Sequence, residues 1–252
     1  MIILEGVSKE FRIPHLRQRT LFHRLVAIGR YRYETFAALE GVSLKVVPGE
    51  FVGVIGHNGS GKSTLLRIVA GIYPATRGRV HVAGSVAPVL DLGVGFRGAL
   101  RVRDNVFLYG VLLGVPRARL LRELRAILDE AGVARFADAP LERLSTGLRV
   151  RLAFTIAMRA EADVLLVDEA LAVGDEAFRR RSLGVLEARK RAGGTALLVS
   201  HNAGPIERLC DRVLVMEEGR VVAEGPAAEM LALHAKRADP VTALARGGPG
   251  KS

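Results

Sequence analysis

The 252-residue sequence has a single cysteine, Cys210, and no apolar run of the ~18–20 residues that a membrane-spanning helix needs. One cysteine excludes an intrachain disulfide and a cysteine-based zinc site, and it fits a reducing cytoplasm. The six histidines form no HxxxH-type pair, so this metal motif is also missing. Because the chain opens directly on the strand-like IILEGV, we expect no secretory signal. A protein of this kind that works at a membrane would work beside it.

The 37 lysines and arginines outnumber the 26 aspartates and glutamates, and the formal net charge is +11. Such an excess indicates an anionic partner: a nucleotide, a nucleic acid or an acidic lipid surface. Charge alone does not choose among them. The imbalance is strongest at 12–34, where six arginines and neither Asp nor Glu lie between Phe11 and Tyr33.

Apolar residues make up 49% of the sequence, enough for one large α/β domain or two lobes that share a core. Alternating and continuous apolar patterns predict strands at 1–11, 36–56 (with a turn at Pro48-Gly49), 79–90, 164–167 and 196–199, and a hairpin at 213–225 that turns at Glu218-Gly219. Helical periodicity predicts helices at 64–71, over most of 102–160 and after Ala227, with a glycine-rich loop at 91–100. The predicted organisation is an α/β body interrupted by a helical block.

The strongest motif is GHNGSGKS at 56–63, between a predicted strand and a predicted helix. It matches G-x-x-x-x-G-K-[ST], whose glycines let backbone N–H groups surround phosphate oxygens while the helix adds its positive N-terminal end. Lys62 would reach the β- and γ-phosphates, and Ser63 would hold Mg²⁺. The alternative is a plain glycine-rich turn. The candidate nucleotide-binding residues here are Gly56, His57, Asn58, Gly59, Ser60, Gly61, Lys62, Ser63 and Thr64.

Two more strands end at polar residues. In DVLLVDE, at 163–169, a buried strand ends at Asp168, which would help to hold Mg²⁺, and Glu169 would polarise the attacking water. His201 follows the strand ALLVS and would donate a hydrogen bond to the γ-phosphate, because ligands bind at the carboxyl ends of parallel strands. Each of these patterns alone is commonly structural. Because a P-loop precedes them in this chain, Asp168 becomes a candidate metal ligand, and Glu169 and His201 become candidate catalytic residues.

The segment LSTGL, at 144–148, opens an arginine-rich helix. Ser145 can cap a helix that starts near Gly147, which leaves a positive N-terminal end for a phosphate. The P-loop already surrounds the phosphates on one side, and this helix belongs to the separate helical block. A second copy of the chain could therefore supply it.

In this order, the P-loop, LSTGL, VLLVDE, LAVGD and LLVSH resemble the ATP-binding cassette ATPases over roughly residues 1–225. The resemblance implies the α/β P-loop NTPase fold of this family, with a RecA-like core, an antiparallel β-subdomain and a helical subdomain at about 102–160, followed by a short C-terminal helix and tail at 226–252. It implies an ATPase that binds ATP and Mg²⁺.

The resemblance also implies an ATP-sandwich homodimer, in which the signature sequence of one subunit contacts the γ-phosphate of ATP held by the other. The usual LSGGQ corresponds to LSTGL, so Ser145 and Gly147 are kept while Thr146 replaces a glycine. Asp175 matches the D-loop aspartate. Phe11 falls where an aromatic residue stacks on adenine, with Tyr31 and Tyr33 as alternatives.

Two departures from the usual family pattern indicate a subfamily. They are the arginine-rich insertion at 12–34 and Asp91 at the position of the Q-loop glutamine. Together with STG, DEALAVGD and FTIAM, they resemble the ATPases that export lipid-linked O-antigen, capsule or teichoic acid. This implies an integral membrane permease as partner, a peripheral location at the cytoplasmic face of the cell membrane, and a lipid-linked glycan as a possible further contact. The alternatives are an ATPase for another solute, or a soluble cassette ATPase acting on ribosomes or DNA. The last class usually fuses two cassettes or carries a long coiled coil. This chain has one P-loop and no sustained heptad pattern, so we expect no nucleic-acid partner.

Two hypotheses concern these departures. In the first, Asp91 either approaches Mg²⁺ through a water molecule, or it turns away and pairs with an arginine while its loop docks the permease. Arg97, Arg101 and Arg103 are the arginines close in sequence. We favour the pairing with an arginine. Residues 16–33 would form either a solvated basic helix or a helix at the mouth of the permease that meets phosphate groups.

Overall fold

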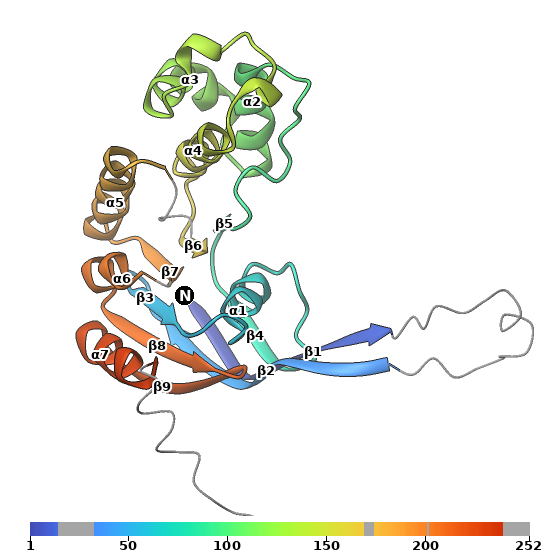
Figure 1. Ribbon diagram of the computed structural model, residues 1–252, viewed down its shortest axis with the longest axis vertical. Coiled ribbons are helices and arrows are strands. Elements are labelled where there is room, and N and C mark those ends of the chain that lie inside the picture. The colour runs from blue at the N-terminus through green and yellow to red at the C-terminus, as the bar shows by residue number, and fades with distance from the viewer. Residues whose placement is uncertain (15–32, 169–173, 201, 239–252) are drawn as a thin grey trace, which may run out of the picture.

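The computed structural model describes residues 1–14, 33–168, 174–200 and 202–238, and Figure 1 shows them as a body of strands beneath a lobe of helices. Of the segment 16–33, residues 16–32 lie outside the described residues, and with them Tyr31.

The body is built on a six-stranded sheet of order β5-β6-β7-β3-β8-β9. The first five strands in this order are parallel, and β9 is antiparallel to β8. Every position of the central strands β3 and β7 is buried, as expected for continuous apolar runs covered on both faces. The strands are β3 (Phe51–Ile55), β5 (Val86–Val89), β6 (Val164–Asp168), β7 (Thr195–Val199), β8 (Arg212–Glu217) and β9 (Arg220–Pro226).

A second, antiparallel sheet has the order β2-β1-β4, with β1 at Ile2–Pro14, β2 at Tyr33–Val46 and β4 at Arg77–Val82. Its apolar face packs on one side of the large sheet in a shared core that includes Leu4, Leu44 and Val54. In Figure 1 the β1–β2 hairpin extends away from the body. The family's antiparallel β-subdomain is thus present.

The stretch 79–90 is strand-like as predicted, but it divides into β4 and β5, which belong to different sheets. Gly84 separates them with a φ of 95°, and a Cβ there would lie 2.6 Å from a carboxylate oxygen of Asp163. The Asp163 carboxylate accepts hydrogen bonds from the backbone N–H and the hydroxyl of Ser85, at 2.7 and 2.8 Å. These contacts turn the chain from one sheet into the other.

The helices cover the large sheet and form the upper lobe. The lobe contains α2 (Val102–Leu112), α3 (Arg117–Glu130) and α4 (Thr146–Ala157), around a core that includes Leu120, Ile127 and Leu152. The body contains α1 (Lys62–Val69), α5 (Glu176–Arg191), α6 (Ala203–Leu209) and α7 (Ala227–Ala238). Among the helices of the described ranges, none has the length and apolar character needed to cross a bilayer.

Buried Asn105 fixes the path of the chain into the helical lobe. Its side-chain amide donates to the carbonyls of Arg97, Leu100 and Arg101 at 3.0–3.2 Å, and its oxygen accepts from the N–H of Arg97 at 2.7 Å. A fully buried amide with all of these partners is a strong local constraint, because an unpaired one would be costly. It holds the end of the glycine-rich loop 91–100 onto α2.

Candidate functional site

The P-loop joins the buried strand β3 to helix α1. Gly61 has a φ of 101°, and a Cβ there would come within 2.7 Å of the Ala38 carbonyl oxygen, so only glycine fits. Gly61 also caps α1 without a side-chain hydrogen bond, and no acidic residue lies in the first turn of this helix. The N-terminal end of α1 therefore keeps its partial positive charge for an anion.

Lys62 is folded back onto the P-loop. Its ammonium group donates to the carbonyl oxygens of Gly56 and His57, both at 2.8 Å, and lies 3.4 Å from the Ser60 hydroxyl. The side chain of Ser60 is fully buried, whereas His57, Asn58 and Gly59 are exposed at the tip of the loop. A buried ammonium ion ringed by carbonyls on a phosphate-sized loop supplies the positive charge that a triphosphate requires.

The parallel sheet brings Asp168 to the same edge as the P-loop. Val199 of β7 pairs with Val54 of β3 on one side and with Asp168 on the other. Two strand spacings thus separate Asp168 from the P-loop strand, about 10 Å. Helix α1, which carries Ser63, packs against β6 and β7. Strand order and register therefore assemble the predicted site from distant segments.

Ser63 and Asp168 fit Mg²⁺ as a partial ligand set. Both are partly exposed oxygen donors, and no cluster of three or more metal-ligating side chains occurs in the described part of the chain. Mg²⁺ is typically bound by one or two protein oxygens together with phosphates and water, so this sparse set suits a metal that arrives with a nucleotide. Glu169 and His201, the predicted catalytic residues, lie next to described strand ends but outside the described residues.

The signature segment lies on the surface of the helical lobe. Ser145 caps α4 as predicted, and its hydroxyl accepts a long hydrogen bond of 3.4 Å from the N–H of Leu148. Ser145, Thr146 and Gly147 are all exposed, and a Cβ on Gly147 would meet nothing within 4 Å. This helix end is therefore open to a ligand brought from outside the chain.

Two arginines that belong to no recognised sequence motif support α4. The guanidinium of Arg149 donates to the carbonyls of Glu142 and Leu144, at 2.6 and 3.0 Å, and so fixes the turn before the signature. Arg151 donates to Asp175 at 2.8 Å and lies over the ring of Phe178. The sequence points to these two arginines only through the arginine-rich composition of the predicted helix.

Asp175, the predicted D-loop aspartate, is the N-cap of α5. One carboxylate oxygen accepts from the N–H of Phe178 at 2.8 Å, and the other accepts from Arg151. The hydrogen bond from the Phe178 backbone, followed by that from Arg151, lowers the pKa of Asp175 below its usual value. The side chain therefore ties the D-loop segment to the signature helix of its own chain.

Asp91 pairs with an arginine, as we favoured, but the partner is Arg67 of α1. One guanidinium nitrogen donates to both carboxylate oxygens, at 2.9 and 3.1 Å. Of the arginines close in sequence, Arg101 and Arg103 both form ion pairs with Asp138 instead. Sequence distance was misleading because α1 passes beside the end of β5, where Asp91 lies.

Phe11, the predicted adenine platform, is half-buried on β1. Its ring meets that of Tyr73 edge-on at 5.5 Å, and the ammonium group of Lys9 lies over it at 5.0 Å. Directly opposite on β2 stands Phe36, which is 52% exposed and was not identified from the sequence. Both rings belong to the β1–β2 hairpin, close to Ala38, whose carbonyl borders the P-loop.

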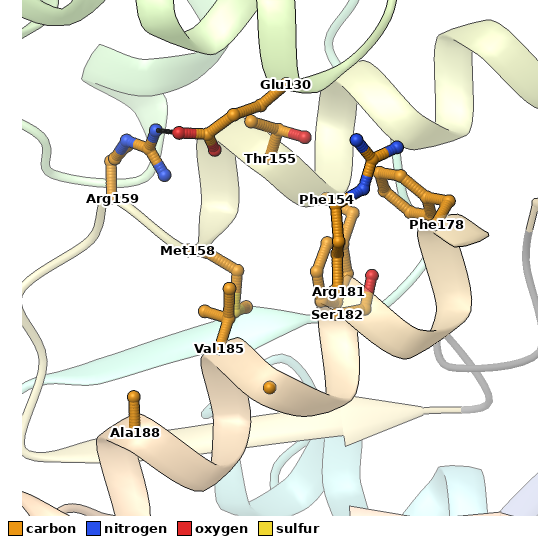
Figure 2. A pocket seen from close by; sticks show the side chains of 11 residues that line it. Glu130, Phe154, Thr155, Met158, Arg159, Phe178, Arg181, Ser182, Val185 and Ala188 are labelled. Carbon is orange, nitrogen blue, oxygen red and sulfur yellow. Dashed lines mark hydrogen bonds and ion pairs between the residues drawn. The ribbon is translucent and has the colours of Figure 1, made fainter.

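A cavity of about 390 Å³ lies between α4 and α5 (Figure 2). Phe154, Met158, Phe178 and Val185 give it an apolar wall, and Arg159 reaches across its rim to Glu130 at 2.7 Å. No residue of the P-loop lines it, so this cavity is separate from the phosphate site. It lies behind the signature helix.

Comparison with known proteins places these motifs in a family. The sequence pattern described as "ABC transporter" matches residues 39–172. The chain is 38% identical to the ABC transporter protein AbcA of Aeromonas salmonicida, over 89% of this chain and 72% of that protein. It is 35% identical to the O-antigen export system ATP-binding protein RfbB of Klebsiella pneumoniae, over 93% and 97%. It is 37% identical to the teichoic acids export ATP-binding protein TagH of Lactiplantibacillus plantarum, over 90% of this chain and 62% of that protein.

Solved structures agree on the fold. The dimeric post-hydrolysis structure of the ATP-binding cassette MJ0796, bound to ADP and phosphate, superposes with a TM-score of 0.72 over 90% of this chain and 99% of that one. At 22% identity the likeness concerns the fold alone.

Proposed function

This chain belongs to the ABC transporter family of ATP-binding proteins, and we propose that it is the ATP-hydrolysing subunit of an exporter for a lipid-linked polysaccharide of the O-antigen, capsule or teichoic acid type. The observation that carries this proposal is the match to an O-antigen export ATPase along 97% of that protein's length. The P-loop geometry around Lys62 supports nucleotide binding independently.

The nucleotide phosphates would bind at the N-terminus of α1. Backbone N–H groups of the P-loop and the ammonium group of Lys62 would surround them, with the Lys62 hydrogen bonds to its own loop exchanged for phosphate contacts. Ser63 and Asp168 would hold Mg²⁺, which, when bound, neutralises phosphate charge. Glu169 would orient and deprotonate the attacking water, and His201 would donate to the γ-phosphate.

The site would be completed by a second copy of the chain. The signature residues Ser145 to Gly147 are exposed at the positive end of α4, in a lobe distinct from the body that carries the P-loop. The first turn of α4 contains no acidic residue, which would otherwise repel a phosphate. We therefore place this helix end against the γ-phosphate of ATP held by the partner subunit.

A permease would dock beside the Asp91 loop, at the cytoplasmic face of the membrane. Val94 is 72% exposed, and on α2 Val111 and Leu112 are 53% and 63% exposed. Leu112 lies near the loop, because a Cβ on Gly95 would come within 3.0 Å of its side chain. Clustered exposed apolar residues of this kind favour a protein partner.

The proposal is tested in the bacterium that carries this gene, by replacing the chain with its Lys62→Ala variant. We expect loss of surface polysaccharide and accumulation of its lipid-linked form inside the cell. Arg77→Gln, which removes an exposed ion pair with Glu10, serves as the control and should keep export. Normal surface glycan in the Lys62→Ala strain, with transport of another solute lost, would overturn the assigned substrate class.

A further inference from the structure

The backbone conformation and the charge of Asp91 have opposite consequences for this position. Its backbone adopts the left-handed conformation, with a φ of 46°, which Asp and Asn tolerate better than most other side chains. Its charge is held against α1, the helix whose N-terminus would bind an anionic triphosphate, and a negative charge beside that helix would disfavour the phosphates. Aspartate therefore suits the backbone at position 91, but its negative charge disfavours phosphate binding unless a cation neutralises it.

Arg67 is that cation, and its position links it to the phosphate site. It lies on α1 one turn after Ser63, and its guanidinium holds both oxygens of Asp91. The hydrogen bond that Arg67 donates to Asp91 raises the pKa of Arg67 above its ordinary value, and the charge of Asp168 acts in the same direction. Arg67 therefore lies on α1 between Ser63 and the loop that begins at Asp91, and it is within electrostatic reach of Asp168.

The loop beyond Asp91 continues these contacts into the helical lobe. The N–H of Val94 donates to the Asp91 carbonyl at 3.1 Å, and that of Phe96 donates to Gly93 at 3.0 Å. The ring of Phe96 packs on Tyr109 of α2, with centroids 4.8 Å apart. An unbroken set of contacts thus runs from α1 through Arg67 and Asp91 to α2.

We propose that Arg67 is a positioning residue that neutralises Asp91 and tethers the 91–96 loop to α1, so that the P-loop helix and the loop beside the helical lobe move as one unit. In this arrangement the Asp91 carboxylate serves as the partner of Arg67 and not as a metal ligand. The inference rests on the proposed function only where it concerns ATP; the tether itself is a property of the nucleotide-free chain.

Hydrogen exchange of the nucleotide-free chain tests the tether. Arg67→Gln and Asp91→Asn should each raise deuterium uptake in the peptide that covers 91–96, and the double variant should add nothing to the larger single effect. Asn keeps the left-handed backbone, so Asp91→Asn removes only the charge. Arg77→Gln is the matched control and should leave this peptide unchanged. Unaltered uptake in Arg67→Gln would overturn the tether.

Binding of a fluorescent ATP analogue with Mg²⁺ tests the neutralisation. Arg67→Gln should weaken binding about three- to tenfold, since it leaves an uncompensated carboxylate against the helix that would bind the phosphates. Adding Asp91→Asn should restore binding. A double variant as weak as Arg67→Gln would overturn the proposal and place Arg67 on the nucleotide itself. A wild-type chain that fails to bind the analogue would contradict the proposed function, while the exchange experiment would still decide the tether.

Discussion

The guanidinium of Arg151 on the signature helix donates a 2.8 Å hydrogen bond to Asp175, the N-cap of α5. The same guanidinium lies 5.3 Å above the ring of Phe178, which packs edge-on against Phe154 of α4. The residues that would meet the partner's ATP are thus anchored, within their own chain, to the start of α5.

We expect Asp175→Asn to separate the two roles of this carboxylate. Asn still caps the helix, so this variant should lose less thermal stability than Asp175→Ala, which loses both cap and ion pair. Arg151→Gln should resemble Asp175→Asn in melting temperature, because both break the same pair. Melting curves of the three variants test this order, and equal losses for Asn and Ala would contradict it.

The depressed pKa of Asp175 predicts how this anchor responds to acid. A carboxyl group whose pKa is lower in the folded state stabilises the fold above its unfolded pKa of about 4, and this stabilisation is lost as the pH falls through the folded value. The difference in melting temperature between wild type and Asp175→Asn should therefore be constant near neutrality and shrink below about pH 4.

Glu169→Gln should bind MgATP but lose about 10²- to 10⁴-fold in turnover, because a positioned proton acceptor contributes on this scale. Nucleotide binding and phosphate release, measured on the same preparation, separate the two effects. Glu161→Gln is the control, since Glu161 is an exposed carboxylate paired with Arg119 on the helical lobe. Near-normal phosphate release in Glu169→Gln would remove this residue from the catalytic role.

The adenine platform can be assigned by comparing two phenylalanines. If Phe11 stacks on the base, Phe11→Ala should weaken ATP binding roughly 5- to 150-fold, since stacking on an aromatic ring is worth about 1–3 kcal/mol. Inhibition by inorganic tripolyphosphate, which has no base, should be unchanged. Loss of affinity in Phe36→Ala with normal binding in Phe11→Ala would move the platform to the exposed ring on β2.

Cys210 should be inert in the native protein. Its side chain is buried, and desolvation raises the pKa of the thiol to about 12. The reactive thiolate is therefore scarce at pH 8, and a thiol reagent should label Cys210 only after unfolding in urea. Rapid labelling of the folded chain would contradict this. An inert native cysteine also leaves the chain suitable for engineered disulfides.

Local motifs with a definite geometry could be predicted from the sequence. The P-loop, the helix cap at Ser145 and the hairpin at Glu218-Gly219 each depend on residues a few positions apart, and the structure has all three. Helix α1 begins at Lys62 rather than 64, because glycine at 61 starts the helix without a polar cap.

Contacts between distant segments could not be predicted. The partner of Asp91 is 24 residues away on α1, and nothing in the spacing of arginines identifies it. The exposure of Phe36 depends on how the β1–β2 hairpin leaves the body, which strand patterning does not specify. In the same way, the stretch 79–90 divides between two sheets because of a tertiary contact between Asp163 and Ser85.

If one ATP site is shared by two chains, a crosslink between singly substituted chains tests this sharing most directly. Chains carrying Asn58→Cys, at the exposed tip of the P-loop, are mixed with mass-tagged chains carrying Thr146→Cys, both in the Glu169→Gln background with MgATP. A disulfide between these two chains can only be intermolecular. The control replaces Asn58→Cys by Ile72→Cys, which is exposed beyond the other end of α1. We predict an ATP-dependent heterodimer for the first mixture and none for the control. Absence of that heterodimer, with a crosslink inside single chains that carry both cysteines, would contradict the shared site.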